Sequence, residues 1–172
     1  MDRLEIDKLL KKTAQGDNVA FEELYKRTNK GVFAFLYTYL HNYADAEDAM
    51  QTTYLKIKRS ISAYRVGTNG RAWILQIAKN HALNEIAKNK RLVPLDAVGE
   101  IACETPFEET GVMRTLERVL NEEEQRIVCL HVLWGYKHRE IAEIVNSPTG
   151  TVTSKYKRAV EKLKRALKEE EK

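Results

Sequence analysis

Apolar residues recur every three or four positions along most of the chain, which is the spacing of amphipathic helices. The first such pattern predicts a helix that ends at Gly16, followed by a second helix that Asp17 caps. Helical spacing continues from Ala20 to Leu40, where Gly31 either kinks the second helix or divides it. The apolar positions of this N-terminal part are Leu4, Ile6, Leu9, Leu10, Ala14, Ala20, Phe21, Leu24, Tyr25, Phe33, Leu36, Tyr37 and Leu40.

A third helical pattern begins at Asp45, a suitable N-cap, with Glu47 and Asp48 favoured near the positive end of the helix dipole. Its predicted buried side comprises Ala46, Ala49, Met50, Thr53, Tyr54, Ile57 and Ile61. A polar loop with two glycines, residues 64–71, leads into a fourth helix from about Arg71 to Asn89. Its predicted apolar side is Trp73, Ile74, Ile77, Ala78, Leu83, Ile86 and Ala87. A flexible polar loop before a basic helix suits single-stranded nucleic acid, although many surface helices look similar.

The clearest pattern lies near the C-terminus, where a short helix over residues 139–145 meets a longer helix. Between them, Asn146 tolerates a left-handed conformation, Ser147 is a candidate N-cap and Pro148 suits the first helical position. The longer helix repeats apolar residues at Val152, Tyr156, Ala159, Val160, Leu163 and Leu167. Two helices at a short turn, the second one basic, are typical of a helix-turn-helix that enters the DNA major groove.

A plain helical hairpin with a solvated basic face is the alternative interpretation of this segment. Small polar residues at the start of the longer helix favour DNA binding, because bulky side chains there keep the backbone out of the groove. By helical geometry, one set of side chains lies opposite the apolar stripe and is predicted to face base edges: Thr151, Ser154, Lys155 and Arg158. Thr149, Lys137 and Arg139 are predicted to hold phosphates.

Charge divides the chain into three segments. Residues 1–91 carry 16 basic and 10 acidic side chains, residues 92–111 carry five acidic and no basic ones, and residues 112–172 carry 13 and 10. Two basic blocks therefore flank an acidic linker, which is consistent with two units that share a polyanionic partner. The predicted fold is all-α, with two small helical domains joined by a flexible acidic linker.

Composition argues against several other classes. Cys103 and Cys129 have no pairing or zinc spacing, and the histidines are scattered, so we expect no metal or other cofactor. No nucleophile motif or glycine-rich phosphate loop marks an enzyme. The N-terminus lacks the apolar core of a signal peptide, and the longest uncharged run, residues 31–44, is too short to span a membrane. A cytoplasmic protein is expected.

Four motifs in order resemble a small sigma-70-family factor of the extracytoplasmic-function (group 4) type. They are GDNVAFEELY from Gly16, DAEDAMQTTYLKI from Asp45, Trp73 with IAKN at 77–80, and LNEEEQRIVCLHVLWGYKHREIAEIVNSPTGTVTSKYKRAVEKL from Leu120. The resemblance implies a protein that binds core RNA polymerase and directs it to promoters. The alternative is a stand-alone helix-turn-helix regulator, which has no need of a strand-capturing loop.

The resemblance also assigns roles. Residues 1–91 resemble region 2, which binds polymerase and melts and reads the −10 element; residues 112–172 resemble region 4, which reads the −35 element. The implied polymerase-binding residues are Asp45, Glu47, Asp48, Gln51, Thr52 and Leu55. The implied −10 DNA-binding residues are Arg65, Asn69, Arg71, Trp73, Lys79, Asn80, Asn84, Lys88 and Arg91.

Partners follow from the same resemblance: the β′ clamp helices and β flap of core polymerase, promoter DNA, and an anti-sigma factor. The acidic linker, residues 92–111, is expected to thread channels that nucleic acid otherwise occupies. Some positions depart from the family pattern: Lys58 stands where a tryptophan is frequent, Lys137 where a Ser or Thr often caps the helix, and Asn146 where glycine is common. The −10 reading helix also has Ala82, Glu85 and Ala87 where more basic residues are frequent.

Overall fold

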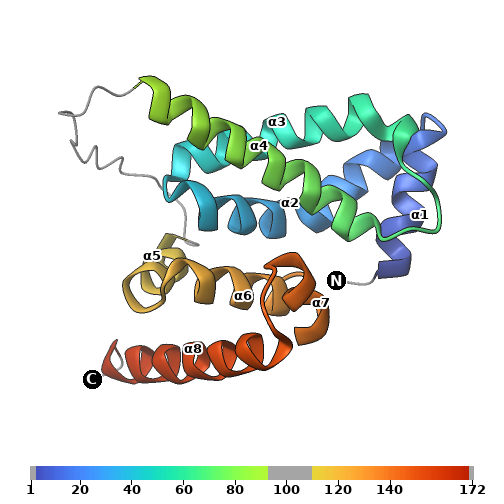
Figure 1. Cartoon of the computed structure of the whole chain (residues 1–172). Helices are drawn as coiled ribbons and strands as arrows, with labels where there is room; N and C mark the ends of the chain where they lie inside the picture. Colours follow the sequence, from blue (N-terminus) through green and yellow to red (C-terminus); the bar gives the residue numbers. More distant parts are fainter. Residues whose placement is uncertain (1–2, 93–109, 171–172) are drawn as a thin grey trace. The chain divides into compact units, whose positions relative to one another are not determined.

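A computed structural model describes residues 3–92 and 110–170, and every regular element in these residues is a helix (Figure 1). The chain divides into two units, Met1–Glu104 and Thr105–Lys172. The predicted all-α class and the two helical domains are thereby confirmed. The predicted linker falls almost entirely on residues 93–109, outside the described residues.

Unit 1 contains α1 (Arg3–Ala14), α2 (Asn18–Leu40), α3 (Tyr43–Ser60), the short 3-10 helix η1 (Ile61–Ala63) and α4 (Gly70–Leu92). The helices α2, α3 and α4 pack against one another, and α1 packs against α2, η1 and α4 (Figure 1). Fully buried side chains from all four α-helices fill the space between them, among them Ile6, Leu10, Leu24, Phe35, Leu36, Ile57 and Ile74.

The beginnings of α2 and α3 differ in how well the sequence predicted them. Asp17 caps α2 as predicted, because its Oδ1 accepts from Ala20 N at 3.0 Å. The helix then runs unbroken through Gly31, so the predicted division does not occur. The predicted N-cap Asp45 is wrong: Asn42 caps α3 by accepting from Asp45 N at 3.0 Å. The helix starts earlier because Tyr43 packs its ring against Phe33 of α2, with 4.9 Å between centroids.

The buried face of α3 matches the prediction, whereas that of α4 does not. Along α4 the buried stripe includes Arg71, Leu75, His81 and Ala82, while Leu83 is 45% exposed. A helix buries positions that share a direction, and Leu83 points about 100° away from Ala82 around the axis. The prediction left out the buried Leu75 and included the exposed Leu83 and Ala87, so it departed from the straight stripe.

Unit 2 contains α5 (Thr110–Val119), α6 (Glu122–Val132), α7 (His138–Ile144) and α8 (Thr149–Glu170). The helix α8 packs against each of the other three (Figure 1). One core cluster joins Leu120, Val128 and Ala159, with four half-buried residues packed against it: Leu116, Val119, Tyr156 and Leu163. Other fully buried side chains are Ile127, Leu130, Trp134, Tyr136 and Ile141.

The turn between α7 and α8 has the predicted left-handed residue, Asn146, with φ 52°. Ser147 N donates to Ala142 O at 2.9 Å, which is the backbone bond of a Schellman termination. Ser147 therefore ends α7 and does not cap α8 as predicted. Pro148 O accepts from Val152 N at 3.1 Å, so Pro148 holds the position before α8, which begins one residue later than expected.

Candidate polymerase and nucleic-acid interfaces

The predicted polymerase-binding residues lie on the outer side of α3. Asp45, Glu47, Asp48 and Gln51 are exposed, and Thr52 is half-buried. Leu55 is 57% exposed, which is high for a leucine on a helix that packs its other face into the core. Positions 48, 51, 52 and 55 share one face of the helix. The residues that the resemblance implies therefore lie on one continuous surface, with acids at its start and an apolar residue at its end.

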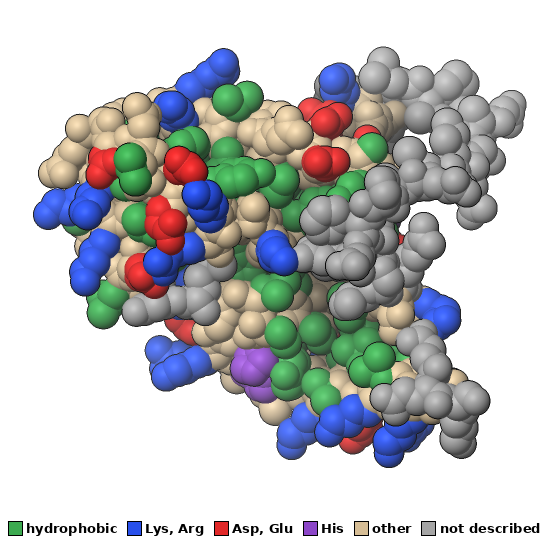
Figure 2. Space-filling view, turned by 180° about the vertical axis from the view of Figure 1, so that it is seen from behind, with side chains coloured by type: hydrophobic (Ala, Val, Ile, Leu, Met, Phe, Trp, Pro, Cys, Tyr) green, Lys and Arg blue, Asp and Glu red, His purple; other side chains and the backbone are tan. Residues whose placement is uncertain are grey.

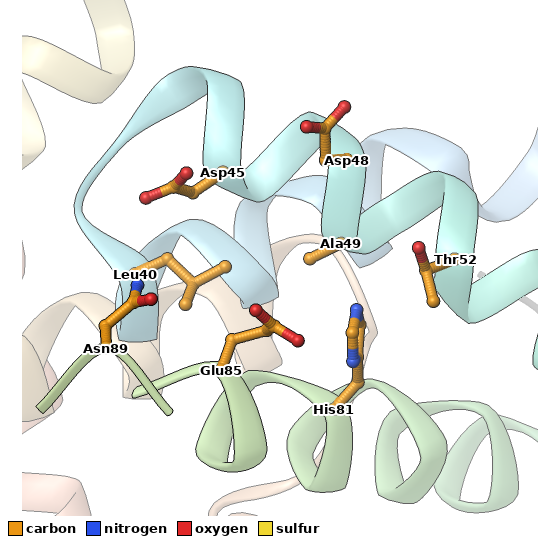
Figure 3. Close-up of a pocket in the computed structure, with 8 residues that line it drawn as sticks. All are labelled: Leu40, Asp45, Asp48, Ala49, Thr52, His81, Glu85 and Asn89. Atoms are coloured by element: carbon orange, nitrogen blue, oxygen red, sulfur yellow. The ribbon is translucent and has the colours of Figure 1, made fainter. Parts of the chain in front are cut away.

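A pocket of about 230 Å³ lies between this surface and α4 (Figure 3). Its lining residues are Leu40, Asp45, Asp48, Ala49, Thr52, His81, Glu85 and Asn89. Figure 3 shows His81 and Glu85 rising from α4 toward α3. Three carboxylates in one lining make the local potential negative, which favours a cationic group from a partner.

His81 links the two walls of this pocket. Its side chain is 8% exposed, and Lys56 Nζ of α3 donates to its Nδ1 at 3.0 Å. Burial lowers the pKa of His81, and the Lys56 charge lowers it further, although Glu85 acts in the opposite direction. A neutral imidazole is the form that can accept this hydrogen bond. The sequence did not predict this contact, because His81 was not assigned to either helix face.

Lys58 lies at the far end of α3, where the family pattern often has tryptophan. Its Nζ sits 5.3 Å from the ring centroid of Phe21 on α2, within cation–π range. The ammonium of Lys58 is thus directed at α2. A tryptophan at this exposed position would add apolar surface that the lysine does not provide.

The predicted −10 residues fall into a loop group and a helix group. In the loop, Arg65 is exposed, and Asn69 accepts weakly from Ala72 N at 3.3 Å near the start of α4. The half-buried Trp73 ring lies 5.3 Å from that of Tyr64. Arg71 is only 6% exposed, so its predicted place on the polar face is wrong. It occupies the first turn of α4 in line with the buried stripe described above.

Along α4, three predicted residues at intervals of four form one exposed row: Asn80, Asn84 and Lys88. Gln76 Nε2 donates to Asn80 Oδ1 at 2.8 Å, which extends the row by one turn. Lys79 is half-buried beside it. The side chain of Arg91 lies outside the described residues. This row can offer amide donors and acceptors together with a positive charge to nucleic acid.

The predicted −35 residues surround the turn between α7 and α8. Lys137, Arg139, Thr149, Ser154 and Arg158 are exposed, and Thr151 is half-buried. Lysine and arginine side chains gather along the part of the surface that α8 forms (Figure 2). Lys137 begins α7 without a side-chain cap, and Glu140 instead accepts from its backbone N–H at 2.8 Å. This leaves the Lys137 ammonium available for a phosphate.

Lys155 differs from the other predicted −35 residues, because it forms an ion pair with Glu123 of α6. Its side chain is 23% exposed. The Lys155 ammonium is therefore only partly exposed, and the ion pair holds it against α6. Sequence periodicity placed Lys155 opposite the core stripe of α8, but could not show that an acid from another helix reaches it.

A second pair joins the same helices. Lys162 Nζ donates to both carboxylate oxygens of Glu124, at 3.0 and 2.7 Å. Glu124 also forms a capping box with Asn121 at the start of α6. Burial alone raises the pKa of Glu124, but the hydrogen bond from Lys162, that from the Asn121 backbone, and nearby positive charges outweigh it and lower the pKa.

Two histidines and a tyrosine pack together behind the turn. The His131 and His138 rings are 4.9 Å apart, and lie 4.5 and 5.0 Å from the Tyr156 ring. His131 Nδ1 donates to Tyr136 O at 2.9 Å, and the side chain is half-buried. This aromatic cluster ties α6, α7 and α8 together beneath the predicted DNA face.

Comparison with known families identifies the family of the protein that carries these surfaces. Residues 24–92 match Sigma-70 region 2, and residues 111–163 match Sigma-70, region 4. The ECF RNA polymerase sigma-E factor of Haemophilus influenzae is 30% identical, over 92% of this chain and 93% of its own length. The chain belongs to the extracytoplasmic-function (ECF) sigma factors. This ECF sigma factor directs promoter-specific initiation by RNA polymerase, and it is an initiation factor rather than an enzyme.

Solved structures agree on the fold of this ECF sigma factor. CnrH, in complex with the cytosolic domain of CnrY, superposes with a TM-score of 0.63 at 20% identity, covering 95% of this chain and 97% of CnrH. The sigma factor RpoE of Bartonella quintana, in complex with the anti-sigma factor NepR, also superposes with a TM-score of 0.63, at 22% identity. The match covers 86% of this chain and 96% of RpoE. No helix in the described part of the chain combines the length and apolar character that a membrane span requires.

Proposed function

We propose that this sigma factor divides promoter recognition between its two units. Residues 1–91 bind core polymerase and open and read the −10 element, and residues 112–172 read the −35 element as duplex. The observation that carries the proposal is the order of surfaces along the chain: an acidic and apolar face on α3, a loop with an exposed amide row on α4, and a basic face on α8.

The α3 face binds core polymerase through Asp48 and Gln51, with Asp45, Glu47, Thr52 and Leu55 around them. The β′ clamp helices are its partner, and the acidic pocket beside α3 suits a basic side chain from such a helix. The β flap is the proposed partner of unit 2.

The −10 element is bound as a single strand. Arg65 and Asn69 in the loop, with Trp73 behind them, receive a base that has left the stack. Asn80, Asn84 and Lys88 then follow the strand along α4, with Lys79 beside them. The buried Arg71 has a supporting role in this arrangement and does not contact DNA directly.

The −35 element is read in the major groove by the first turns of α8. Arg158 and Ser154 contact base edges, with Thr151 beside them, because hydrogen-bond patterns in that groove distinguish all base pairs. Lys137, Arg139 and Thr149 hold the phosphates on either side. Lys155 joins the DNA contacts when it leaves Glu123.

Regulation and location complete the proposal. Both solved structures compared above are complexes with a second protein, and in the RpoE complex this protein is an anti-sigma factor. An anti-sigma factor that covers the polymerase-binding or DNA-binding surfaces is therefore proposed for this chain as well. The protein acts in the cytoplasm, where its polymerase and promoter DNA are found.

Run-off transcription tests the proposal. Core polymerase is incubated with fragmented host DNA, with and without this protein, and new transcripts are sequenced. We expect discrete transcripts whose upstream regions share two elements at a fixed spacing. Binding of the free protein to those promoters is expected to be weak, with specificity appearing when polymerase is present. Specific and tight binding of the free protein to duplex promoter DNA contradicts the proposed function.

A further inference from the structure

One carboxylate on α1 holds both ends of the loop that precedes α4. Tyr64 Oη donates to Asp7 Oδ1 at 2.9 Å, and Gly70 N donates to the same oxygen at 2.7 Å. These partners lie 57 and 63 residues away from Asp7 in the sequence. Asp7 sits between Ile6 and Leu10, which are both buried, so the α1 backbone beneath the carboxylate is fixed by packing.

Glycine at position 70 lets the Asp7 carboxylate come this close to the backbone of α4. A Cβ on Gly70 lies 2.5 Å from Asp7 Oδ1 and 2.5 Å from Leu10 Cδ1, which is closer than real Cβ contacts. Tyr64 is 5% exposed and packs on Trp73. The contact with Asp7 therefore fixes the backbone where α4 begins and, through Tyr64, supports the Trp73 ring.

Between the two anchors, the loop forms its own turn with an exposed tip. Thr68 donates to Arg65 O through its N–H at 3.2 Å and through its Oγ1 at 2.7 Å. Gly67 supplies a positive φ of 90°. Residues 65–68 are exposed throughout. The tip is thus shaped in advance and presented to solvent from a base that Asp7 closes.

We propose that Asp7 is a positioning residue for promoter opening, acting through the loop of residues 64–70. A loop that is ordered before DNA arrives does not lose conformational freedom when it captures a base. The inference rests on the proposed role of this loop in holding the melted −10 strand. It adds to that role a residue outside the region 2 match, which begins at residue 24.

The test uses full-length protein with core polymerase on a promoter found by run-off transcription, with 2-aminopurine in the −10 element. We expect Asp7→Ala to reduce the rate of opening about tenfold. Affinity for core polymerase and for −35 duplex is expected to stay within about twofold. Asp7→Asn keeps an oxygen that accepts both bonds, and is expected to restore most of the opening rate. Tyr64→Phe removes one bond and keeps the ring, so an intermediate defect is expected.

Glu5→Ala is the matched control on α1, because Glu5 pairs with Arg27 of α2 and does not contact the loop. Wild-type opening in Asp7→Ala overturns the inference, as does an equal defect in Glu5→Ala. If Asp7→Ala fails to bind polymerase, Tyr64→Phe decides, and wild-type opening in that variant overturns the inference. Arg65→Ala separates the two proposals. Normal promoter opening in Arg65→Ala refutes the role of the loop itself. A defect in Arg65→Ala together with normal opening in Asp7→Ala refutes only the role of Asp7.

Discussion

Lys162 of α8 and Glu124 of α6 form a two-point contact, with Nζ 3.0 and 2.7 Å from the two carboxylate oxygens. Glu124 is 3% exposed, and its Oε2 also accepts from Asn121 N at 3.1 Å. One side chain therefore completes the cap of α6 and joins that helix to α8. The position of α8, the helix proposed to read the −35 element, depends on this junction.

Loss of this junction is expected to destabilise unit 2. Glu124→Ala removes the reciprocal cap bond and leaves Lys162 without its acceptor, at a cost of about 1–3 kcal/mol in the free energy of unfolding. Hydrogen exchange of backbone amides in α6 and α8 measures the effect without interference from unit 1. Glu161→Ala, an exposed acid on α8, is the control and is expected to change stability by less than about 0.5 kcal/mol. Equal protection in both variants contradicts the prediction.

Acid is expected to loosen the aromatic cluster behind the helix-turn-helix. Thr153 Oγ1 donates to Thr149 O at 2.9 Å and therefore accepts from His138 Nδ1 at 3.1 Å. His138 Nε2 is buried and has no hydrogen-bond partner in the described structure. Burial lowers the pKa of His138, and the neighbouring His131 and Lys157 lower it further. A proton on Nε2 has no acceptor there.

The sign of the pH effect follows from linkage. The pKa of His138 is about 6.5 in the unfolded chain and lower in the folded one, so the unfolded chain binds the proton first as pH falls. Its contribution to stability is complete above about pH 6.5 and is lost as pH falls toward the folded pKa. NMR titration of the ring signals, with hydrogen exchange in α7 and α8 from pH 7.5 to about 5, measures this. In His138→Gln the exchange rates, corrected for intrinsic chemistry, should depend less on pH; an unchanged pH dependence counts against the prediction.

Local patterns predicted the ends of several helices and the surfaces that they expose. Asp17 and Asn146 were identified from their residue types, because a side-chain cap and a left-handed turn depend on a few adjacent residues. The face of α3 followed from its period alone. Asn42 was missed as the cap of α3 because Asp45 is an equally good residue type, and the packing of Tyr43 on Phe33 decided between them.

Contacts between helices were not predictable from the sequence. The helical period of a sequence shows which side of a helix is apolar. It does not show which other helix contacts the residues at the edge of that apolar side. Lys155 was expected to face DNA freely, and its partner Glu123 lies 32 residues away. The sequence did not indicate that Asp7 contacts the loop, because an acidic residue in an amphipathic helix normally faces solvent. The burial of Arg71 depends on where α4 begins, which its sequence left uncertain by one residue.

The ion pair with Glu123 leads to a prediction about −35 binding. Arg158→Ala is expected to cost about 1–3 kcal/mol in binding and to relax base preference at one position. Lys155→Ala is expected to cost less, because its ammonium must leave Glu123 before it reaches DNA. Glu123→Gln releases Lys155 and is expected to increase −35 affinity at low salt.

These variants are compared in holoenzyme, on promoters with single substitutions in the −35 element. Lys164→Ala removes one exposed positive charge from α8 further from the turn, and is expected to leave base preference unchanged. If Arg158→Ala keeps wild-type preference at every −35 position, the assigned reading face of α8 is wrong. Lower affinity in Glu123→Gln contradicts the restraining role of Glu123.

Charge reversal on α3 tests the proposed polymerase-binding surface. Asp48 is exposed, lines the acidic pocket with Asp45 and Glu85, and contributes nothing to the core. Asp48→Arg is therefore expected to weaken affinity for core polymerase at least about tenfold while leaving the melting temperature within about 2 °C. Glu22→Arg makes the same charge change on α2, where Glu22 pairs with Lys26 in solvent, and is expected to bind polymerase normally. Equal affinities in the two variants mean that Asp48 is only a solvated residue in the second turn of α3.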